Sequence, residues 1–547
     1  MALKSSALLS AAVEVGLIES DMLATLTLRS RRERVDLIDL VCLHGRLPPS
    51  ALYQAVAECR SLPFIAAGYA EPDDDAMRRL SPSLLQRGSV ACVRHQNEVW
   101  LWTADPDDHA THETARRLIG SPRAIALGEP ESIASLVNRW TRKHQPSAMP
   151  PSTDGQPALD HIGGLNAIFK QAYLARASDI HFEPGKEGMR VRLRVDGRLR
   201  DYPRELTLEQ GAGLVSRTKV LAGMDISETR EPQDGGLRHE IPGVAAFDVR
   251  VATAPTRFGE RATLRLMGEQ AEALTLERLG MHAQTLSHFR ETIARPHGIV
   301  LITGPTGSGK STTLYAALGE LTSPETNVLS VEDPIERVIE GVSQVQVNGK
   351  ISFAGALRSF LRHDPDVIML GEIRDLETAD VALKAAVTGH LVFSTLHTNS
   401  AAAAVTRLAD MGVERFMIGA TLSAVIAQRL VRRLCQRCKT ERPASPREKA
   451  MLGTDKVHVP HGCSACVGTG WRGRIGLFET LWIDGALAQR IAAGDNEAQI
   501  QAQAKRFESL WSDGLRKVLS GSTTLDEVLS VAHPPDELAA ILLADRD

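Results

Sequence analysis

The sequence predicts a multidomain protein of the α/β class. With 547 residues, the chain is too long for a single hydrophobic core, so three or four domains are expected. Between residues 271 and 434, apolar runs of strand length alternate with helical patterns, which is typical of a parallel sheet covered by helices on both faces. In this part, a glycine-rich segment separates the apolar run 299–302 from the helical pattern 312–318. We therefore expect residues 271–434 to form the central domain.

Two α+β domains, joined by a linker, are predicted before this central domain. Residues 1–140 combine short helical patterns with an apolar stretch, 90–102, that predicts strands. Residues 141–157 are rich in proline, serine and glycine, which is typical of a flexible linker. Residues 158–270 contain alternating apolar and polar runs, such as 189–195, that predict half-buried strands.

After the central domain, the sequence predicts a small cysteine-containing subdomain, 435–475, and a mostly helical region, 476–547. Overall charge gives no indication of a nucleic-acid or anionic-membrane binder, because 63 basic residues nearly balance 67 acidic ones. No apolar run approaches the length of a membrane span, and the N-terminal residues are not typical of a signal peptide. We expect a cytoplasmic protein, in which seven cysteines argue for metal binding rather than disulfides.

The glycine-rich segment has the pattern of a phosphate-binding P-loop. Its glycines let backbone N–H groups point at phosphate oxygens, and the N-terminus of the following helix adds positive potential. Lys310 can reach the β- and γ-phosphates, and Ser311 can coordinate Mg²⁺. A glycine-rich turn without a ligand is the alternative, which the flanking strand and helix disfavour. The predicted nucleotide-binding residues are Gly304, Pro305, Thr306, Gly307, Ser308, Gly309, Lys310, Ser311 and Thr312.

Acidic residues follow two later apolar runs of the central domain. Glu332 and Asp333 come after the run 328–331, and Glu372 follows the run 367–370. A parallel sheet brings the carboxyl ends of its strands to one edge, which also carries the phosphate loop. Because hydrolysis needs Mg²⁺ and a carboxylate that positions water, we predict Glu372 as the base and Glu332 with Asp333 in the Mg²⁺ and water shell. Ordinary caps and solvated loop acids are the alternative.

Two histidines bracket a third apolar run, 391–396. Histidine can donate a hydrogen bond to a γ-phosphate, so we predict that His390 contacts the nucleotide and that His397 takes part in catalysis. Histidines at strand ends more often have core or capping roles. These two histidines are candidates only because they occur in the same predicted domain as the P-loop.

Two C-x-x-C pairs predict a structural zinc site. Cys435 with Cys438 and Cys463 with Cys466 are separated by about two dozen residues, and four thiolates in this spacing match tetrahedral Zn²⁺. A redox dithiol is the alternative, although it usually comes as a single pair. The three other cysteines have no partner by spacing and are expected to be small apolar core residues: Cys42, Cys59 and Cys92.

Taken together, these motifs resemble those of the type II/type IV secretion traffic ATPases, in the group that powers type II secretion and extends type IV pili. Besides the P-loop, three segments match in order: 331–336 is similar to the family's aspartate box, 364–375 to its Walker B segment and 388–399 to its histidine box. The resemblance implies a RecA-like P-loop ATPase core that uses ATP and Mg²⁺, with Zn²⁺ held by the cysteine subdomain. It also implies that residues 158–270 supply arginines to the nucleotide.

Arg250 and Arg265 are the arginines that this resemblance selects. A guanidinium near the β- and γ-phosphates stabilises the charge that grows in the transition state. A surface or interdomain salt bridge is the alternative for each of them.

The function implied by the resemblance is that of a homohexameric motor powering type II protein secretion through pseudopilus assembly, with type IV pilus assembly as the alternative. Its expected partner is the cytoplasmic domain of an inner-membrane platform protein, bound by residues 1–140, so its membrane association would be indirect and peripheral. A nucleic-acid translocase is the rival from another class, but the aromatic and basic pattern of a single-strand channel is missing. A non-hydrolysing scaffold would need a damaged catalytic set.

One departure concerns a regulatory nucleotide. Asp36 stands where relatives that bind cyclic di-GMP have a glycine, and its carboxylate would add negative charge toward a phosphate. This makes cyclic di-GMP a doubtful ligand.

Overall fold

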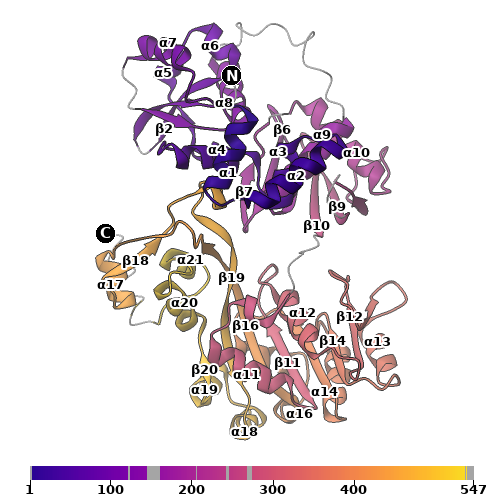
Figure 1. The fold of residues 1–547 in the computed structure, drawn as a ribbon. Helices are drawn as coiled ribbons and strands as arrows, with labels where there is room; N and C mark the ends of the chain where they lie inside the picture. The colour runs from indigo at the N-terminus through magenta and orange to yellow at the C-terminus, as the bar shows by residue number, and fades with distance from the viewer. Residues whose placement is uncertain are drawn as a thin grey trace. The chain divides into compact units, whose positions relative to one another are not determined.

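The computed structural model describes residues 3–95, 97–120, 124–144, 161–204, 206–241, 246–267, 274–535 and 538. The chain divides into two compact units (Figure 1). The first unit comprises residues 1–269, 435–440 and 460–472, and the second comprises 270–434, 441–459 and 473–547. Most of the predicted linker, from residue 145 onward, lies outside the described residues. Its first four residues belong to a helix that ends at His144.

The first unit begins with four helices: α1 (Ser5–Glu14), α2 (Ser20–Glu33), α3 (Leu37–Gly45) and α4 (Pro49–Cys59). A four-stranded sheet follows, in the order β1 (Glu71–Pro72), β2 (Val90–His95), β3 (Glu98–Thr103) and β4 (Ile125–Leu127). Its helices are α5 (Asp74–Arg79), α6 (Pro82–Arg87), α7 (His109–Ile119) and α8 (Pro130–His144). Strands β2 and β3 occupy the stretch 90–102 for which the sequence predicted strands.

The rest of the first unit is a six-stranded sheet with two helices, α9 (His161–Leu174) and α10 (Leu208–Leu221). Its strand order is β7 (Arg198–Asp201), β6 (Gly188–Val195), β5 (Ala177–Gly185), β10 (Gly259–Met267), β9 (Phe247–Thr256) and β8 (Gln233–His239). In β6, Met189, Val191 and Leu193 are buried while the residues between them are more exposed. This alternation agrees with the half-buried strand that the sequence predicted.

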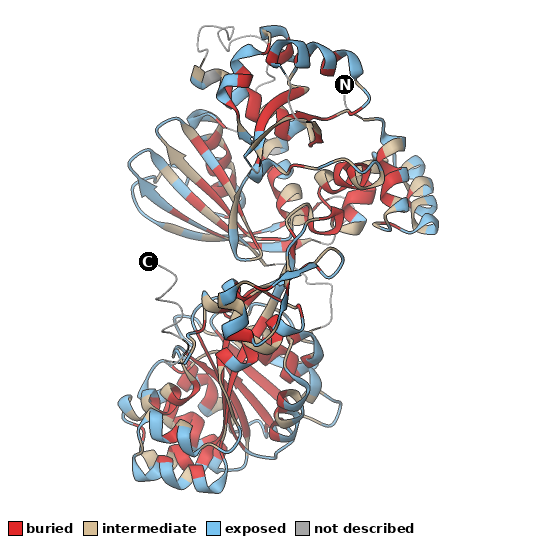
Figure 2. Ribbon diagram, turned by 90° about the vertical axis from the view of Figure 1, so that its left-hand side faces the viewer, coloured by how far each residue is buried: buried red, intermediate tan, exposed pale blue. Residues whose placement is uncertain are grey.

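The second unit is built on an eight-stranded sheet. Its strand order is β13 (Val342–Gln346), β12 (Val328–Glu332), β14 (Val367–Leu370), β15 (Leu391–Leu396), β11 (Gly298–Thr303), β16 (Leu422–Leu434), β19 (Trp471–Trp482) and β20 (Phe507–Glu508). The strands from β13 to β16 in this order are parallel to their neighbours. Figure 2 shows the strands of this sheet largely buried and the outer helical surfaces exposed.

Helices cover both faces of this sheet. Successive side chains of a strand point to opposite faces, and neighbouring residues of β11 pack against different helices. In β11, Ile299 packs in the core that contains α13 (Phe353–Phe360), α14 (Leu376–Val387) and α15 (Ala401–Asp410). The next residue, Val300, packs in the core that contains α11 (Ala283–Ile293) and α12 (Lys310–Leu321). The predicted fold class, an α/β core with additional α+β parts, is confirmed.

The region expected to be mostly helical begins with a long strand. Strand β19 crosses residue 476 and joins the sheet beside β16, so the sheet continues beyond the predicted boundary at residue 434. Glycines and arginines in its first half obscure the apolar pattern, whereas Leu477, Phe478 and Leu481 in its second half are buried. Helices do follow β19: α18 (Gly485–Ala493), α19 (Glu497–Gln503), α20 (Leu510–Leu519) and α21 (Leu525–Leu529). One more helix, α16 (Arg415–Thr421), lies earlier in the chain, just before β16.

Between β16 and β19 lie two short strands, one helix and the cysteine loop. The elements are β17 (Thr440–Pro443), α17 (Pro446–Leu452), β18 (Lys456–Val459) and the 3-10 turn η4 (Ser464–Cys466). Among the helices of the described ranges, none has the length and apolar character needed to cross a bilayer.

Candidate nucleotide and metal sites

The loop between β11 and α12 has a backbone that only glycine fits at two positions. Gly304 and Gly309 have φ angles of 146° and 90°. A Cβ atom at Gly304 would lie 2.5 Å from the backbone oxygen of Gln428, and one at Gly309 would lie 2.8 Å from the Gln428 Nε2. These positive φ angles and close approaches require glycine. The strand, loop and helix predicted around this segment are all present.

The Lys310 ammonium lies against this loop. Its Nζ donates hydrogen bonds to the backbone oxygens of Gly304, at 2.9 Å, and Pro305, at 3.2 Å. Burial lowers the pKa of Lys310, and the negative charge of Glu372 acts in the opposite direction.

The other residues of the loop divide into an exposed tip and a half-buried end. Pro305, Thr306 and Gly307 are exposed, whereas Ser311 and Thr312 are half-buried in the first turn of α12. The buried Ser308 Oγ has no hydrogen-bond partner among the described residues. A buried hydroxyl without a partner is costly, so this atom is suited to a ligand that the loop would hold.

Glu372, Asp333 and His397 are brought together around Arg374 at the carboxyl edge of the sheet. The Arg374 Nε donates to Glu372 at 2.6 Å, and the Arg374 Nη1 lies 3.3 Å from the Asp333 Oδ2. The His397 Nε2 lies 3.3 Å from the other Glu372 oxygen. Hydrogen bonding to Glu372 is the main cause that raises the pKa of Arg374, so the guanidinium stays charged. Sequence reasoning missed Arg374, although it lies two residues after Glu372.

Glu332 is buried and hydrogen-bonded on several sides. Its carboxylate accepts from the Tyr315 hydroxyl, from the Ser330 Oγ at 2.7 Å and from the Gln344 Nε2 at 2.9 Å. Burial first, and then the Glu332 carboxylate, raise the pKa of Tyr315, so its hydroxyl remains a donor. The Tyr315 oxygen in turn accepts from the backbone N–H of Glu336 at 3.2 Å. Glu332 therefore braces the segment after β12, and Asp333 is the more exposed of the two acids.

The structure places His390 away from the P-loop of its own chain. It immediately precedes β15, and its backbone oxygen accepts from the Gly298 N–H at the start of β11. The P-loop follows the end of β11, so a six-residue strand of about 20 Å separates His390 from it. Its Nδ1 lies 2.9 Å from the Ala385 backbone oxygen, which is a capping contact. The expectation that His390 binds the nucleotide of its own chain is wrong.

Arg250 and Arg265 face each other on neighbouring strands of the first unit. They are paired in the antiparallel register of β9 and β10. The Arg265 Nε donates to the Asp179 Oδ1 at 3.1 Å, with most of the arginine side chain exposed. Their contact with a nucleotide held by the second unit stays a prediction.

Two residues that sequence reasoning did not select support the P-loop from β16. The buried Gln428 accepts a hydrogen bond from the Thr313 Oγ1 of α12 at 2.7 Å. Arg429 donates to the backbone oxygens of Gln428 and Asn399, both at 3.0 Å, and so links the P-loop side to the loop after β15. The only available signal was their position in the segment that leads to the first cysteine pair.

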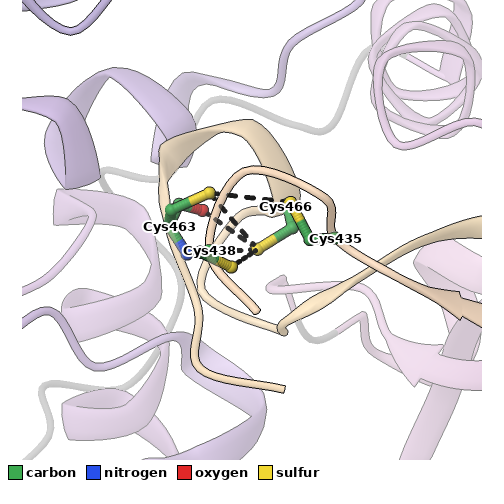
Figure 3. A group of neighbouring side chains, drawn as sticks. All are labelled: Cys435, Cys438, Cys463 and Cys466. Carbon is green, nitrogen blue, oxygen red and sulfur yellow. Dashed lines mark hydrogen bonds between the residues drawn. The ribbon is translucent and has the colours of Figure 1, made fainter. Parts of the chain in front are cut away.

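The four paired cysteines converge on one point (Figure 3). All four Sγ atoms lie within 4.8 Å of one another, and three pairs are 3.7–3.8 Å apart. Four sulfurs about 2.3 Å from a central zinc are about 3.8 Å apart, whereas a disulfide needs about 2.05 Å, so this geometry fits Zn²⁺ and excludes disulfides. Backbone N–H groups donate to two of the sulfurs: Gly462 to Cys438 at 3.3 Å, and Cys463 and Gly470 to Cys466 at 3.1 and 3.2 Å.

The other cysteines lie apart from this cluster, and burial raises the pKa of Cys42 and of Cys92 to about 12. Both behave as the small core residues that the sequence predicted, while Cys59 is half-buried and donates weakly to the backbone oxygen of Ala11.

The glycine-constrained loop, the lysine and the acids at the carboxyl edge of a parallel sheet define a P-loop ATPase. The sequence model of the family described as "Type II/IV secretion system protein" matches residues 156–530, and that of the "MshEN domain" matches residues 60–146. The chain belongs to the Type II/IV secretion system protein family, as the sequence motifs indicated.

Two relatives extend this result. The type IV pilus assembly ATPase PilB of Thermus thermophilus is 39% identical over 92% of this chain, which spans 60% of that relative's length. The type II secretion system protein E of Pseudomonas aeruginosa is 42% identical over 86% of this chain and 99% of its own. Among solved structures, the ATPase DotB of Legionella pneumophila is 24% identical, with a TM-score of 0.53 over 69% of this chain and 97% of its own, and shows a shared fold.

Asp36, the basis for doubting cyclic di-GMP, precedes the MshEN match. Its side chain accepts from the backbone N–H of Asp39 at 3.1 Å and so caps α3. This capping gives Asp36 a structural role, and the expectation about cyclic di-GMP stays a prediction.

Proposed function

We propose that this protein is the ATP-hydrolysing motor of a type II secretion system and drives pseudopilus assembly at the cytoplasmic face of the inner membrane. The observation that carries the proposal is the arrangement of Lys310 in the P-loop and of Glu372 beside Arg374 and His397 at the carboxyl edge of the sheet, in a chain that spans 99% of a type II secretion system protein E. Type IV pilus assembly is the second candidate, because the similarity to a pilus assembly ATPase extends over 92% of this chain.

In this proposal, the P-loop binds the phosphates of ATP. The Lys310 ammonium would exchange its two backbone carbonyl contacts for phosphate oxygens, and the Ser308 hydroxyl would gain the partner that it lacks. Ser311 would hold Mg²⁺, which neutralises charge on the β- and γ-phosphate oxygens. The exposed tip of the loop allows a phosphate to approach from solvent.

Glu372 would orient the attacking water, while Arg374 and His397 hold its carboxylate from two sides. His397 is also placed to donate to a γ-phosphate, since it follows β15 at the same edge as the P-loop. Glu332 would act as a positioning residue, because its oxygens are already occupied by donors, and Asp333 would remain available for the Mg²⁺ and water shell.

The other parts of the chain would serve the same motor. Arg250 and Arg265 would stabilise transition-state charge, and closure of successive subunits in a homohexamer would turn hydrolysis into movement. Residues 1–140 would bind the cytoplasmic domain of the membrane platform, which would make membrane association indirect. The proposed divisions are 1–140, the linker 141–157, the arginine-supplying domain 158–270, the ATPase domain 271–434, the zinc subdomain 435–475 and the C-terminal region 476–547.

A chromosomal Lys310→Ala allele in the source bacterium tests the proposal. Loss of type II protein secretion with normal piliation supports it, whereas loss of pili with normal secretion would assign the protein to pilus assembly. Normal secretion and normal piliation together would contradict both candidates. Strong stimulation of ATP turnover by nucleic acid would instead favour the translocase class.

A further inference from the structure

The two cysteine-containing segments, residues 435–440 and 460–470, are together called the cysteine loop below. They pack against the N-terminal helices within the first unit. The Ser464 Oγ donates to the Glu58 Oε2 at 3.1 Å, and the Ser464 backbone N–H donates to the other oxygen of the same carboxylate. Arg437, between the first two cysteines, donates to the backbone oxygen of Val15 at the end of α1. The side chain of Leu17 packs against the cysteine cluster itself. Three independent contacts therefore join segments that are about 400 residues apart in sequence.

The contact is close as well as polar. Gly468 has a φ angle of 72°, and a Cβ atom there would lie 3.1 Å from the Gln54 Oε1 and 3.5 Å from the Phe64 ring. Ser464 is fully buried, and Glu58 is half-buried. Both oxygens of Glu58 accept from one residue, which is a charge-assisted and directional contact.

The loop has only a very small apolar core of its own. Its core consists of Ala465 and the cysteines, and its regular structure between residues 460 and 470 is one three-residue turn. Ser464 lies between two of the predicted zinc ligands, Cys463 and Cys466, and Arg437 lies between the other two. Because both polar contacts arise from residues inside C-x-x-C pairs, a metal that held the sulfurs would also hold these donors in place.

We propose that the zinc-loaded cysteine loop is a docking platform for α4 and the end of α1, so that metal occupancy determines how firmly these two segments are held. The inference uses the zinc fit derived above and is independent of which secretion branch the motor serves. The first cysteine pair follows β16 directly after Leu434, and the second pair shortly precedes β19, which begins at Trp471. Docking therefore ties α4 and the end of α1 to segments that are continuous in sequence with the ATPase sheet. Zinc would thereby couple the partner-binding part of the chain to the motor.

Hydrogen–deuterium exchange of the full-length protein tests this proposal, with metal content measured in parallel. Removing zinc with a chelator should raise the exchange rates of amides in α4 and in residues 62–66 by about tenfold or more, while β11 stays protected. Glu58→Ala should raise the exchange rates of the α4 amides by a similar factor, and this variant should still hold one zinc per chain. The matched control is Glu113→Ala, which removes an exposed carboxylate on α7 that pairs with Arg117 of the same helix.

Three results would overturn the proposal. Unchanged exchange of the α4 amides after chelation would mean that zinc stabilises only the cysteine loop itself. Loss of zinc from Glu58→Ala would make Glu58 a support of the metal site. Increased exchange throughout β11 on chelation would mean that the metal serves the fold in general.

Discussion

Replacing Glu372 by glutamine removes the charge of the proposed base with little change in shape. In the structure, one oxygen of Glu372 accepts from the Arg374 Nε at 2.6 Å, and the other lies 3.3 Å from the His397 Nε2. Glutamine has only one acceptor oxygen, so its amide group must turn an N–H toward one of these donors. The variant therefore loses both the charge that orients water and one of the contacts that hold the group in place.

Loss of a positioned base typically slows catalysis by about 10²- to 10⁴-fold, which corresponds to about 2.7–5.5 kcal/mol in the activation free energy. Nucleotide affinity should change by no more than about threefold, because Lys310 and the P-loop backbone, which would bind the phosphates, are untouched. Phosphate release under steady state gives kcat, and a fluorescent nucleotide gives Kd.

The control is Glu377→Gln, which removes the charge of an exposed carboxylate on α14 that pairs with Arg358 at 2.7 Å. Exposed pairs contribute about 0–1 kcal/mol, so this variant should keep its hydrolysis rate. Near-normal turnover by Glu372→Gln would refute the assignment of the base. An equal loss in affinity and rate would place Glu372 in nucleotide binding instead.

Three further predictions concern the supporting groups. Tyr315→Phe should lower the free energy of unfolding of the second unit by about 1.5–3 kcal/mol in denaturant titration, since it removes a donor to the buried Glu332 carboxylate; unchanged stability would contradict the bracing role. Arg250→Ala and Arg265→Ala should each lower kcat more than nucleotide affinity, and normal turnover by both variants as hexamers would make the arginines structural. Cys463→Ser should lose zinc in elemental analysis yet still bind nucleotide; wild-type protein that contains no zinc and has four freely titratable thiols would contradict the metal site.

The parts of the site that could be predicted from the sequence are those carried by contiguous residues. The P-loop needs a strand, glycines and a helix in immediate succession, and the C-x-x-C pairs set their own spacing. The acids at the strand ends were predictable because parallel strands deliver their ends to one edge. The alternation of apolar residues likewise predicted β6 and the two-faced central sheet.

Other features depend on contacts that no local pattern encodes. The donors to Glu332 include Tyr315 and Gln344, which come from different elements, and Gln428 reaches the P-loop from β16. Arg374 was overlooked because an arginine beside acids is common on surfaces. The error with His390 had a different cause, since the histidine-containing segment was treated as one unit although a whole strand separates its two histidines. Strand direction alone would have placed them at opposite edges.

We propose that this chain hydrolyses ATP at the edge formed by the P-loop and Glu372. This proposal is tested most directly by the Mg²⁺-dependent release of phosphate from ATP by the purified full-length protein, with Lys310→Ala measured beside it at equal concentration. We expect steady turnover by the wild type, none above background by Lys310→Ala, and no stimulation by single-stranded nucleic acid. Equal turnover by the two proteins, or assembled wild-type protein that binds ATP without hydrolysing it, would contradict this proposal.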